Sequence, residues 1–198
     1  MPLNLPNILT WSRLFAVPVV MVALFLPGSS ASWTALTVFI LAALTDYLDG
    51  HLARSRGQLS PFGTFLDPVA DKILVASVIL ALVALDRIDG WTLIAAFVIT
   101  LREIVISGLR EFLAGARRAL PVSRLAKWKT AVQMVALGLL ILGGHGDPLP
   151  NTQWLGEASL WLAAILSVIT GLDYFRAHLG DVLNGPAAHP TKQDTAAE

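Results

Sequence analysis

Long apolar runs separated by short polar clusters restrict how this chain can fold more than any other feature. Hydrophobic residues make up 55% of its 198 residues and charged residues only 14%, whereas soluble domains carry about 25% charged residues. A helix that crosses a bilayer needs about 20 mainly apolar residues. We therefore expect an all-α integral membrane protein with six transmembrane helices in one bundle, some extending into polar sequence. The runs cover 8–26, 33–48, 69–85, 91–112, 130–142 and 158–172.

Composition also excludes several kinds of function. The chain has 14 basic and 14 acidic residues and a formal net charge of zero, so nothing suggests a nucleic-acid partner. It has no cysteine, which excludes thiolate metal sites and a cysteine nucleophile. Residues 1–184 are interpreted as one membrane domain. The Pro/Ala/Thr-rich tail, 185–198, is expected to be disordered.

The basic residues predict an orientation in the membrane. If the N-terminus is cytoplasmic, the outer loops hold only Arg87, and the positive-inside rule then places both termini and the polar loops 49–68 and 110–129 in the cytoplasm. The basic residues on the cytoplasmic side are Arg54, Arg56, Arg110, Arg117, Arg118, Arg124, Lys127, Lys129, Arg176 and Lys192. Three tryptophans near the predicted outer ends fit interfacial anchoring, with simple packing as an equal alternative. They are Trp33, Trp91 and Trp154.

Four aspartates flank the polar stretch between the second and third runs. Asp46 and Asp49 are three residues apart, and Asp67 and Asp71 are four apart, so each pair would share one face of a helix. Four carboxylates in a low-dielectric place repel one another unless cations neutralise them. Such oxygen ligands suit Mg²⁺, Mn²⁺ or Ca²⁺. Two metals sharing these carboxylates would form a clamp for a diphosphate.

Small and basic residues next to the first pair favour a nucleotide diphosphate as ligand. Gly50 and Ala53 each follow an aspartate of that pair by four residues and leave room for a base or a phosphate. Arg54 adds a guanidinium suited to a phosphate. One aspartate pair at a span end would usually be a solvated boundary, but two pairs with these neighbours favour a binding site.

Residues 46–71 read D-x2-D-G-x2-A-R-x8-G-x3-D-x3-D, which resembles the signature of the CDP-alcohol phosphatidyltransferases at every specified position. The resemblance implies a six-helix homodimer in the bacterial inner membrane, with an active site facing the cytoplasm and two Mg²⁺ or Mn²⁺ ions. It also implies that an alcohol attacks the diphosphate of CDP-diacylglycerol and that CMP leaves. By position, it makes Asp46, Asp49, Asp67 and Asp71 metal ligands, Asp71 also the general base, and Gly50, Ala53 and Arg54 the CDP-binding face.

Other segments are similar to the phosphatidylglycerophosphate synthase branch of that family. These are 3–13, 62–72, 101–110 and 127–130. The acceptor implied is sn-glycerol 3-phosphate, while inositol phosphate, serine and phosphatidylglycerol stay open as alternatives. A divalent-cation transporter is an alternative from another class. It would need acidic residues that continue through the membrane, whereas these stop at one side.

Basic residues near the predicted cytoplasmic mouth suit an acceptor that carries a phosphate. We predict that Arg110, Lys127 and Arg102 bind this phosphate; attraction to anionic lipids is the alternative for the loop. Arg102 and Glu103 interrupt an apolar span, so they either line a cavity or form a structural pair.

Three polar residues at the start of the first run would form a polar stripe on one face of its helix. Asn7, Thr10 and Arg13 recur at three-residue steps. We predict that Asn7 and Thr10 contact CDP, with a helix N-cap as the alternative for Asn7. Arg13 is predicted to face the cavity or to extend to the inner surface.

Overall fold

The computed structural model describes residues 5–56, 61–115, 124–143 and 151–183. Only the helical backbone is described at 5–10, 46–56, 61–68, 71, 114–115, 124 and 178–183. The described residues form six helices and no strand. The helices are α1 (Leu5–Phe25), α2 (Ser29–Arg56), α3 (Pro61–Ala84), α4 (Thr92–Gly115), α5 (Arg124–Leu142) and α6 (Thr152–Leu183).

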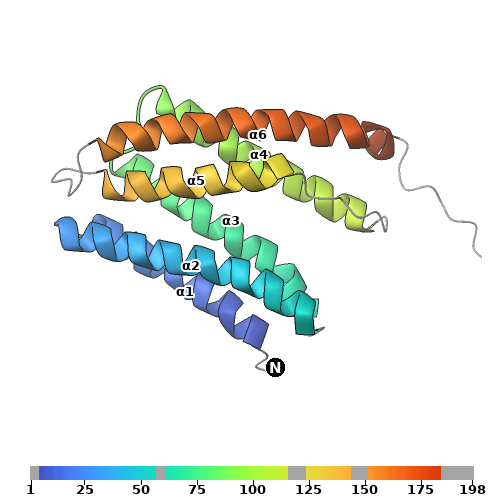
Figure 1. Cartoon of the computed structure of the whole chain (residues 1–198), viewed down its shortest axis with the longest axis horizontal. Coiled ribbons are helices and arrows are strands. Elements are labelled where there is room, and N and C mark those ends of the chain that lie inside the picture. Colours follow the sequence, from blue (N-terminus) through green and yellow to red (C-terminus); the bar gives the residue numbers. More distant parts are fainter. Residues whose placement is uncertain (1–4, 57–60, 116–123, 144–150, 184–198) are drawn as a thin grey trace, which may run out of the picture.

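Successive helices run in alternating directions through one bundle (Figure 1). α1 packs against α2 and α3, and α6 packs against α4 and α5; the two groups meet where α2 and α3 contact α5 and where α3 contacts α4. The start of α1 and the end of α6 lie at the same end of the bundle as the junction of α2 with α3 (Figure 1). We call this the aspartate end, after the aspartates near that junction.

The opposite end, where α2, α4 and α6 begin, is the tryptophan end. Trp33, Trp91 and Trp154 lie at or beside these helix starts and are exposed. They thus lie near helix ends, as the sequence predicts, where an amphipathic ring would suit the boundary between lipid and water.

The surface of the described helices has the character of a membrane protein. By length and composition, three described segments can cross a membrane: Thr92–Leu113, Leu125–Leu142 and Thr152–Ala177. Shorter apolar segments lie in α1, α2 and α3. Large side chains such as Phe15, Leu80 and Phe97 are about two-thirds exposed, which suits lipid rather than water.

Several helices extend beyond the apolar runs, as predicted. The predicted polar loop over 49–68 is wrong for most of its length, because α2 continues to Arg56 and α3 begins at Pro61. Leu52, Ala53 and Arg54 are strong helix formers, and an antiparallel helix pair needs only a few residues as a connection. All four aspartates therefore lie on helices, as their spacing predicts.

The contact between α5 and α6 depends on a small residue. A Cβ added to Gly156 would lie 2.8 Å from Leu140 Cγ and 3.1 Å from the Leu140 backbone nitrogen. Small residues let helix backbones approach closely in membranes, where packing rather than the hydrophobic effect drives association. Gly156 therefore sets how closely α5 and α6 approach.

Arg87 forms hydrogen bonds with both α5 and α6 at the tryptophan end. Its Nη1 donates to the carbonyl oxygens of Ile141 (2.5 Å) and Leu140 (3.4 Å), two of the last carbonyls of α5, which have no partner within the helix. Gln153 Nε2 in α6 donates to the Arg87 carbonyl oxygen at 2.8 Å. The sequence places Arg87 in an outer loop; in the structure it is partly buried and joins the α3–α4 connection to α5 and α6.

We predict that Gly156→Ala lowers the free energy of unfolding by about 1–3 kcal/mol, since the backbone of Leu140 cannot move aside without separating the helices. Gly108→Ala in α4 is the matched control, because an added Cβ there meets nothing within 4 Å. Thermal unfolding of both variants in one detergent measures the difference. Equal melting temperatures would contradict the packing role of Gly156.

Candidate active site

The aspartate pairs lie at matching levels on two consecutive antiparallel helices. Asp49 is seven residues before the end of α2 and Asp67 is six residues after the start of α3, while Asp46 and Asp71 are each ten residues from those points. At 1.5 Å per residue, Asp49 and Asp67 lie about 10 Å along their helices from the α2–α3 connection, and Asp46 and Asp71 lie about 15 Å from it. Because both segments are helical, the aspartates of each pair lie about one turn apart on the same helix, as their three- and four-residue spacings predict.

The backbone placement of the pairs fits the donor set expected for a hard divalent cation, because both span ends bring carboxylates to one end of the bundle. Among side chains that the structure describes, no three His, Asp or Glu residues are close enough to hold a metal. The side chains of Asp46, Asp49, Asp67 and Asp71 fall outside that set. The same is true of Gly50, Ala53 and Arg54, which lie further along α2 toward its end.

The polar stripe of α1 also lies toward the aspartate end. Asn7 and Thr10 are in the first turns of α1, with only their backbone described. α1 begins at Leu5, so Asn7 lies inside the helix and the N-cap alternative is wrong. Arg13 is 1% exposed, so its side chain is buried and does not extend to the surface.

Two arginines of α4 face α6. Arg102 Nη2 donates to Thr170 Oγ1 (3.4 Å), whose own hydroxyl donates to the Leu166 carbonyl oxygen (2.7 Å). Arg110 Nη2 donates to the Tyr174 hydroxyl oxygen at 3.1 Å, and its guanidinium lies 5.3 Å from the centre of the Tyr174 ring. Thr170 and Tyr174 are one turn apart, so a single face of α6 holds both arginines.

Glu103 joins α4 to α5. Its carboxylate accepts a hydrogen bond from the Lys129 ammonium, and Arg102 Nη1 lies 3.8 Å from the same oxygen. Lys129 is 1% exposed and Glu103 is partly exposed. The structural pair considered from the sequence is therefore present, but its main cation comes from α5 rather than from Arg102.

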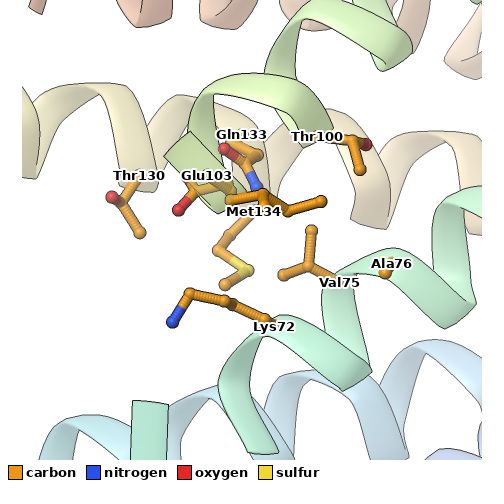
Figure 2. Close-up of a pocket in the computed structure, with 9 residues that line it drawn as sticks. Lys72, Val75, Ala76, Thr100, Glu103, Thr130, Gln133 and Met134 are labelled. Carbon is orange, nitrogen blue, oxygen red and sulfur yellow. The ribbon is translucent and has the colours of Figure 1, made fainter. Parts of the chain in front are cut away.

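A pocket of about 80 Å³ lies where α3, α4 and α5 meet. Figure 2 shows Lys72 from α3, Glu103 from α4 and Gln133 from α5 around this space. Thr130 adds a hydroxyl, and Val75, Ala76 and Met134 are among its apolar lining. Lys72 directly follows Asp71 in the chain, so the pocket lies beside the aspartate segment.

The predicted phosphate ligands have different surroundings. Arg102 and Arg110 lie together against α6, whereas Lys127 is exposed on α5. Arg117 and Arg118, two other basic residues of the predicted cytoplasmic loop, lie outside the described residues.

The sequence places Lys129 in the polar cytoplasmic loop 110–129, which is wrong, because Lys129 is buried in α5 and paired with Glu103. Sequence reasoning assigned no role to Gln133, Thr170 or Tyr174. A signal was available, because Gln133 and Thr170 are polar residues inside apolar runs, where polar groups usually face a cavity or a partner.

Comparison with known proteins decides the family. The family model for CDP-alcohol phosphatidyltransferases matches residues 3–169. The chain belongs to the CDP-alcohol phosphatidyltransferase family. A relative from Rickettsia felis, named CDP-diacylglycerol–glycerol-3-phosphate 3-phosphatidyltransferase, is 44% identical over 174 residues, covering 88% of this chain and 94% of the relative. One of the same name from Cereibacter sphaeroides is 40% identical, covering 89% and 96%.

The fold agrees with the family. The apo crystal structure of phosphatidylinositol phosphate synthase from Mycobacterium tuberculosis superposes with a TM-score of 0.61 at 23% identity, covering 95% of this chain and 94% of that one. Structures of that protein with CDP-DAG bound and with manganese and citrate give TM-scores of 0.59 and 0.56. These likenesses show a shared fold.

We predict that Lys129→Met destabilises the protein by about 1–3 kcal/mol, because the partly exposed Glu103 carboxylate then keeps only its longer contact with Arg102. Adding Glu103→Gln should restore much of that loss, since the carboxylate charge that lost its main partner is then gone. Thermal unfolding of the two single variants and the double variant measures the coupling. Additive effects would show that the pair does not act as a unit.

Proposed function

We propose that this enzyme transfers the phosphatidyl group of CDP-diacylglycerol to sn-glycerol 3-phosphate, giving phosphatidylglycerophosphate and CMP. The observation that carries the proposal is the complete aspartate signature of residues 46–71, on two helices that bring its pairs to matching levels. The choice of acceptor is supported by relatives that share 40–44% identity over nearly their whole length and bear that activity as their name.

The four aspartates are the proposed metal ligands. Asp46 and Asp49 from α2 and Asp67 and Asp71 from α3 would hold two Mg²⁺ or Mn²⁺ ions. When bound, such ions polarise the phosphoryl oxygens and neutralise charge on the leaving phosphate. A structural neighbour in complex with manganese supports this assignment.

Asp71 is the proposed general base. Its carboxylate takes the proton of the acceptor hydroxyl as the alkoxide oxygen forms a bond to the phosphatidyl phosphorus. The bond from that phosphorus to the bridging oxygen breaks, and CMP leaves with the electron pair. No covalent enzyme intermediate is needed, in keeping with the absence of cysteine.

The CDP group is proposed to lie against α2 and α1. Gly50 and Ala53 leave room for it, Arg54 contacts a phosphate, and Asn7 and Thr10 contact the nucleotide from α1. All five positions lie toward the aspartate end of their helices.

The acceptor phosphate is proposed to bind Arg102 and Arg110, with Lys127 attracting it at the entrance. Two guanidinium groups held on one face of α6 are preorganised for a phosphate. Because Thr170 and Tyr174 accept hydrogen bonds from these arginines, they act as positioning residues.

The chain is proposed to be a homodimer that crosses the bacterial inner membrane six times, with both termini and the active site in the cytoplasm. The alternating helices and the exposed tryptophans at one end support this arrangement. Residues 1–184 would form the membrane domain. The tail 185–198, proposed to be disordered, lies outside the described residues.

We predict that Asp71→Asn lowers CMP release from CDP-diacylglycerol and sn-glycerol 3-phosphate at least about 1000-fold, because it removes both a base and a ligand. Asp89→Asn, an exposed carboxylate at the tryptophan end, is the control and should keep full activity. Purified enzyme assayed with serine, inositol phosphate and phosphatidylglycerol as well tests the acceptor. Full activity of Asp71→Asn would contradict the assignment.

The same preparations test the transporter alternative. In the described part of the chain, Glu103 is the acidic side chain nearest the middle of a span, and it is paired with Lys129. Carboxylates thus do not continue through the described bundle. Manganese uptake by proteoliposomes without CDP-lipid would favour transport, whereas metal-dependent CMP release without uptake supports the enzyme.

We predict that Tyr174→Phe raises the KM for sn-glycerol 3-phosphate about fivefold, equivalent to about 1 kcal/mol, with little change in kcat. The ring stays beneath Arg110, but the hydroxyl acceptor is lost. Phe175→Leu, at an exposed neighbour, is the control. An unchanged KM for the acceptor in Tyr174→Phe would contradict the proposal that the Tyr174 hydroxyl positions Arg110 for the acceptor phosphate.

A further inference from the structure

The wall of the pocket between α3, α4 and α5 is more apolar than its residue types suggest. Thr100 Oγ1 donates to the carbonyl oxygen four residues earlier in α4 (2.9 Å), and Thr130 Oγ1 does the same in α5 (3.1 Å). Gln133 Oε1 exposes less than 1 Å² of surface, so it is not turned into the space. The Glu103 carboxylate is engaged by Lys129. An occupant would therefore meet mainly methyl, methylene and thioether groups, which suit a hydrocarbon.

The pocket is open at the surface of the bundle, at a depth where lipid chains lie. Ile104 lines the pocket and is 62% exposed. It lies 12 residues after Thr92 in the 22-residue span Thr92–Leu113, which is about 18 Å along the helix from the tryptophan end. α3 packs mainly against α1 and touches α4 at few points, so a chain can pass between α3 and α4 from the bilayer into the pocket.

The volume of the pocket restricts the occupant to a narrow chain. The pocket holds about 80 Å³, roughly half the volume of an apolar cavity of about 150 Å³ that binds benzene. A few methylene groups of a chain fit into this space, whereas a ring does not. The rest of a long chain would continue past Ile104 into the bilayer.

One side of the pocket adjoins the proposed reaction centre. Lys72 follows Asp71 in α3, and Figure 2 shows its nitrogen on the side of the pocket where Thr130 lies, away from Thr100. Thr130 is six residues after the start of α5, so this side points toward the aspartate end. Ala76, in the pocket wall, is about one helical turn deeper along α3. A phosphate bound near Asp71 would thus have an ammonium group close by and apolar space about one turn away, which matches the order of groups in a phosphatidyl lipid.

We infer that this pocket binds the first carbons of one acyl chain of CDP-diacylglycerol. The inference rests on the proposed function and deepens it, because it names the route by which the lipid part of that substrate passes from the reaction centre to the bilayer. The chain lies against Val75, Ile104 and Met134. Lipid tails are as apolar as this wall, so the fit of the chain rather than the hydrophobic effect decides how well it binds.

The first test fills the pocket. Ala76→Phe places a ring where the chain would lie, and Ala131→Phe, at an exposed position of α5 outside the pocket lining, is the matched control. Purified protein with Mn²⁺ binds radiolabelled CDP, which has no acyl chain, and CDP-diacylglycerol then displaces it. We expect Ala76→Phe to bind CDP-diacylglycerol about tenfold more weakly and CDP as the wild type does. Wild-type affinity of Ala76→Phe for both ligands would overturn the inference.

The second test uses the wild type, so it does not depend on how a variant folds. CDP-diacylglycerol with a diazirine near the carbonyl end of its acyl chains is photolysed on the protein, and the modified residues are found by mass spectrometry. We expect modification at Val75, Ile104 or Met134, and protection by excess CDP. This measurement decides if Ala76→Phe does not fold or also loses CDP.

Phosphatidylethanolamine carrying the same diazirine is the control for ordinary lipid contact. We expect it to modify these residues much less than CDP-diacylglycerol does. Equal modification by both lipids would show only a lipid-facing surface, and modification of other helices alone would place the chain elsewhere. Either result would overturn the inference.

The outcomes separate this inference from the function on which it rests. If CDP-diacylglycerol does not displace CDP from the wild type, the proposed function is wrong. If it displaces CDP and CMP is released with sn-glycerol 3-phosphate, but the chain modifies other helices, only the inference about the pocket is wrong.

Discussion

The contact between the Lys129 ammonium and the Glu103 carboxylate is the interaction on which the polar side chains of α4, α5 and α6 in the candidate site depend. A charge inside an apolar bundle is tolerated only with a partner or a cavity. Lys129 is almost completely buried, and the pair fixes α5 against α4 beside the pocket. With Glu103 engaged by α5, Arg102 and Arg110 face α6 and are held there by Thr170 and Tyr174.

The two ends of the bundle are built by different means. At the tryptophan end, Gly156 packs against Leu140, and Arg87 and Gln153 join the helix ends by hydrogen bonds. These contacts join neighbouring helices directly, which favours a fixed arrangement of the helices at this end. Toward the aspartate end, the described polar side chains bridge helices but also border a pocket. Rigidity at one end thus supports a site near the other.

The helices and the main motif could be predicted from the sequence because both depend on local patterns. Apolar runs identified all six helices, and the three- and four-residue spacings of the aspartates anticipated their helical setting. The extent of α2 beyond Asp49 was missed, because hydropathy falls where helix propensity persists.

Long-range partners were harder to predict. Nothing in the order of residues states that Lys129, rather than Lys127, turns inward, since a shift of two residues reverses the side of a helix. Glu103 and Tyr174 likewise have partners at 26 and 64 residues' separation. Such pairs emerge only when the helices are assembled, although a polar residue such as Gln133 in an apolar run marks where to look.

The continuity of α6 has a mechanical consequence. This helix runs for 32 residues and carries the Gly156 contact near one end and Tyr174 near the other. The two positions are separated by about 27 Å along the axis, so a rotation of about two degrees about the Gly156 contact would displace Tyr174 by about 1 Å. Transmembrane helices adjust their tilt to the thickness of the bilayer. A change in the tilt of α6 would therefore also move the Tyr174 hydroxyl that accepts the hydrogen bond from Arg110.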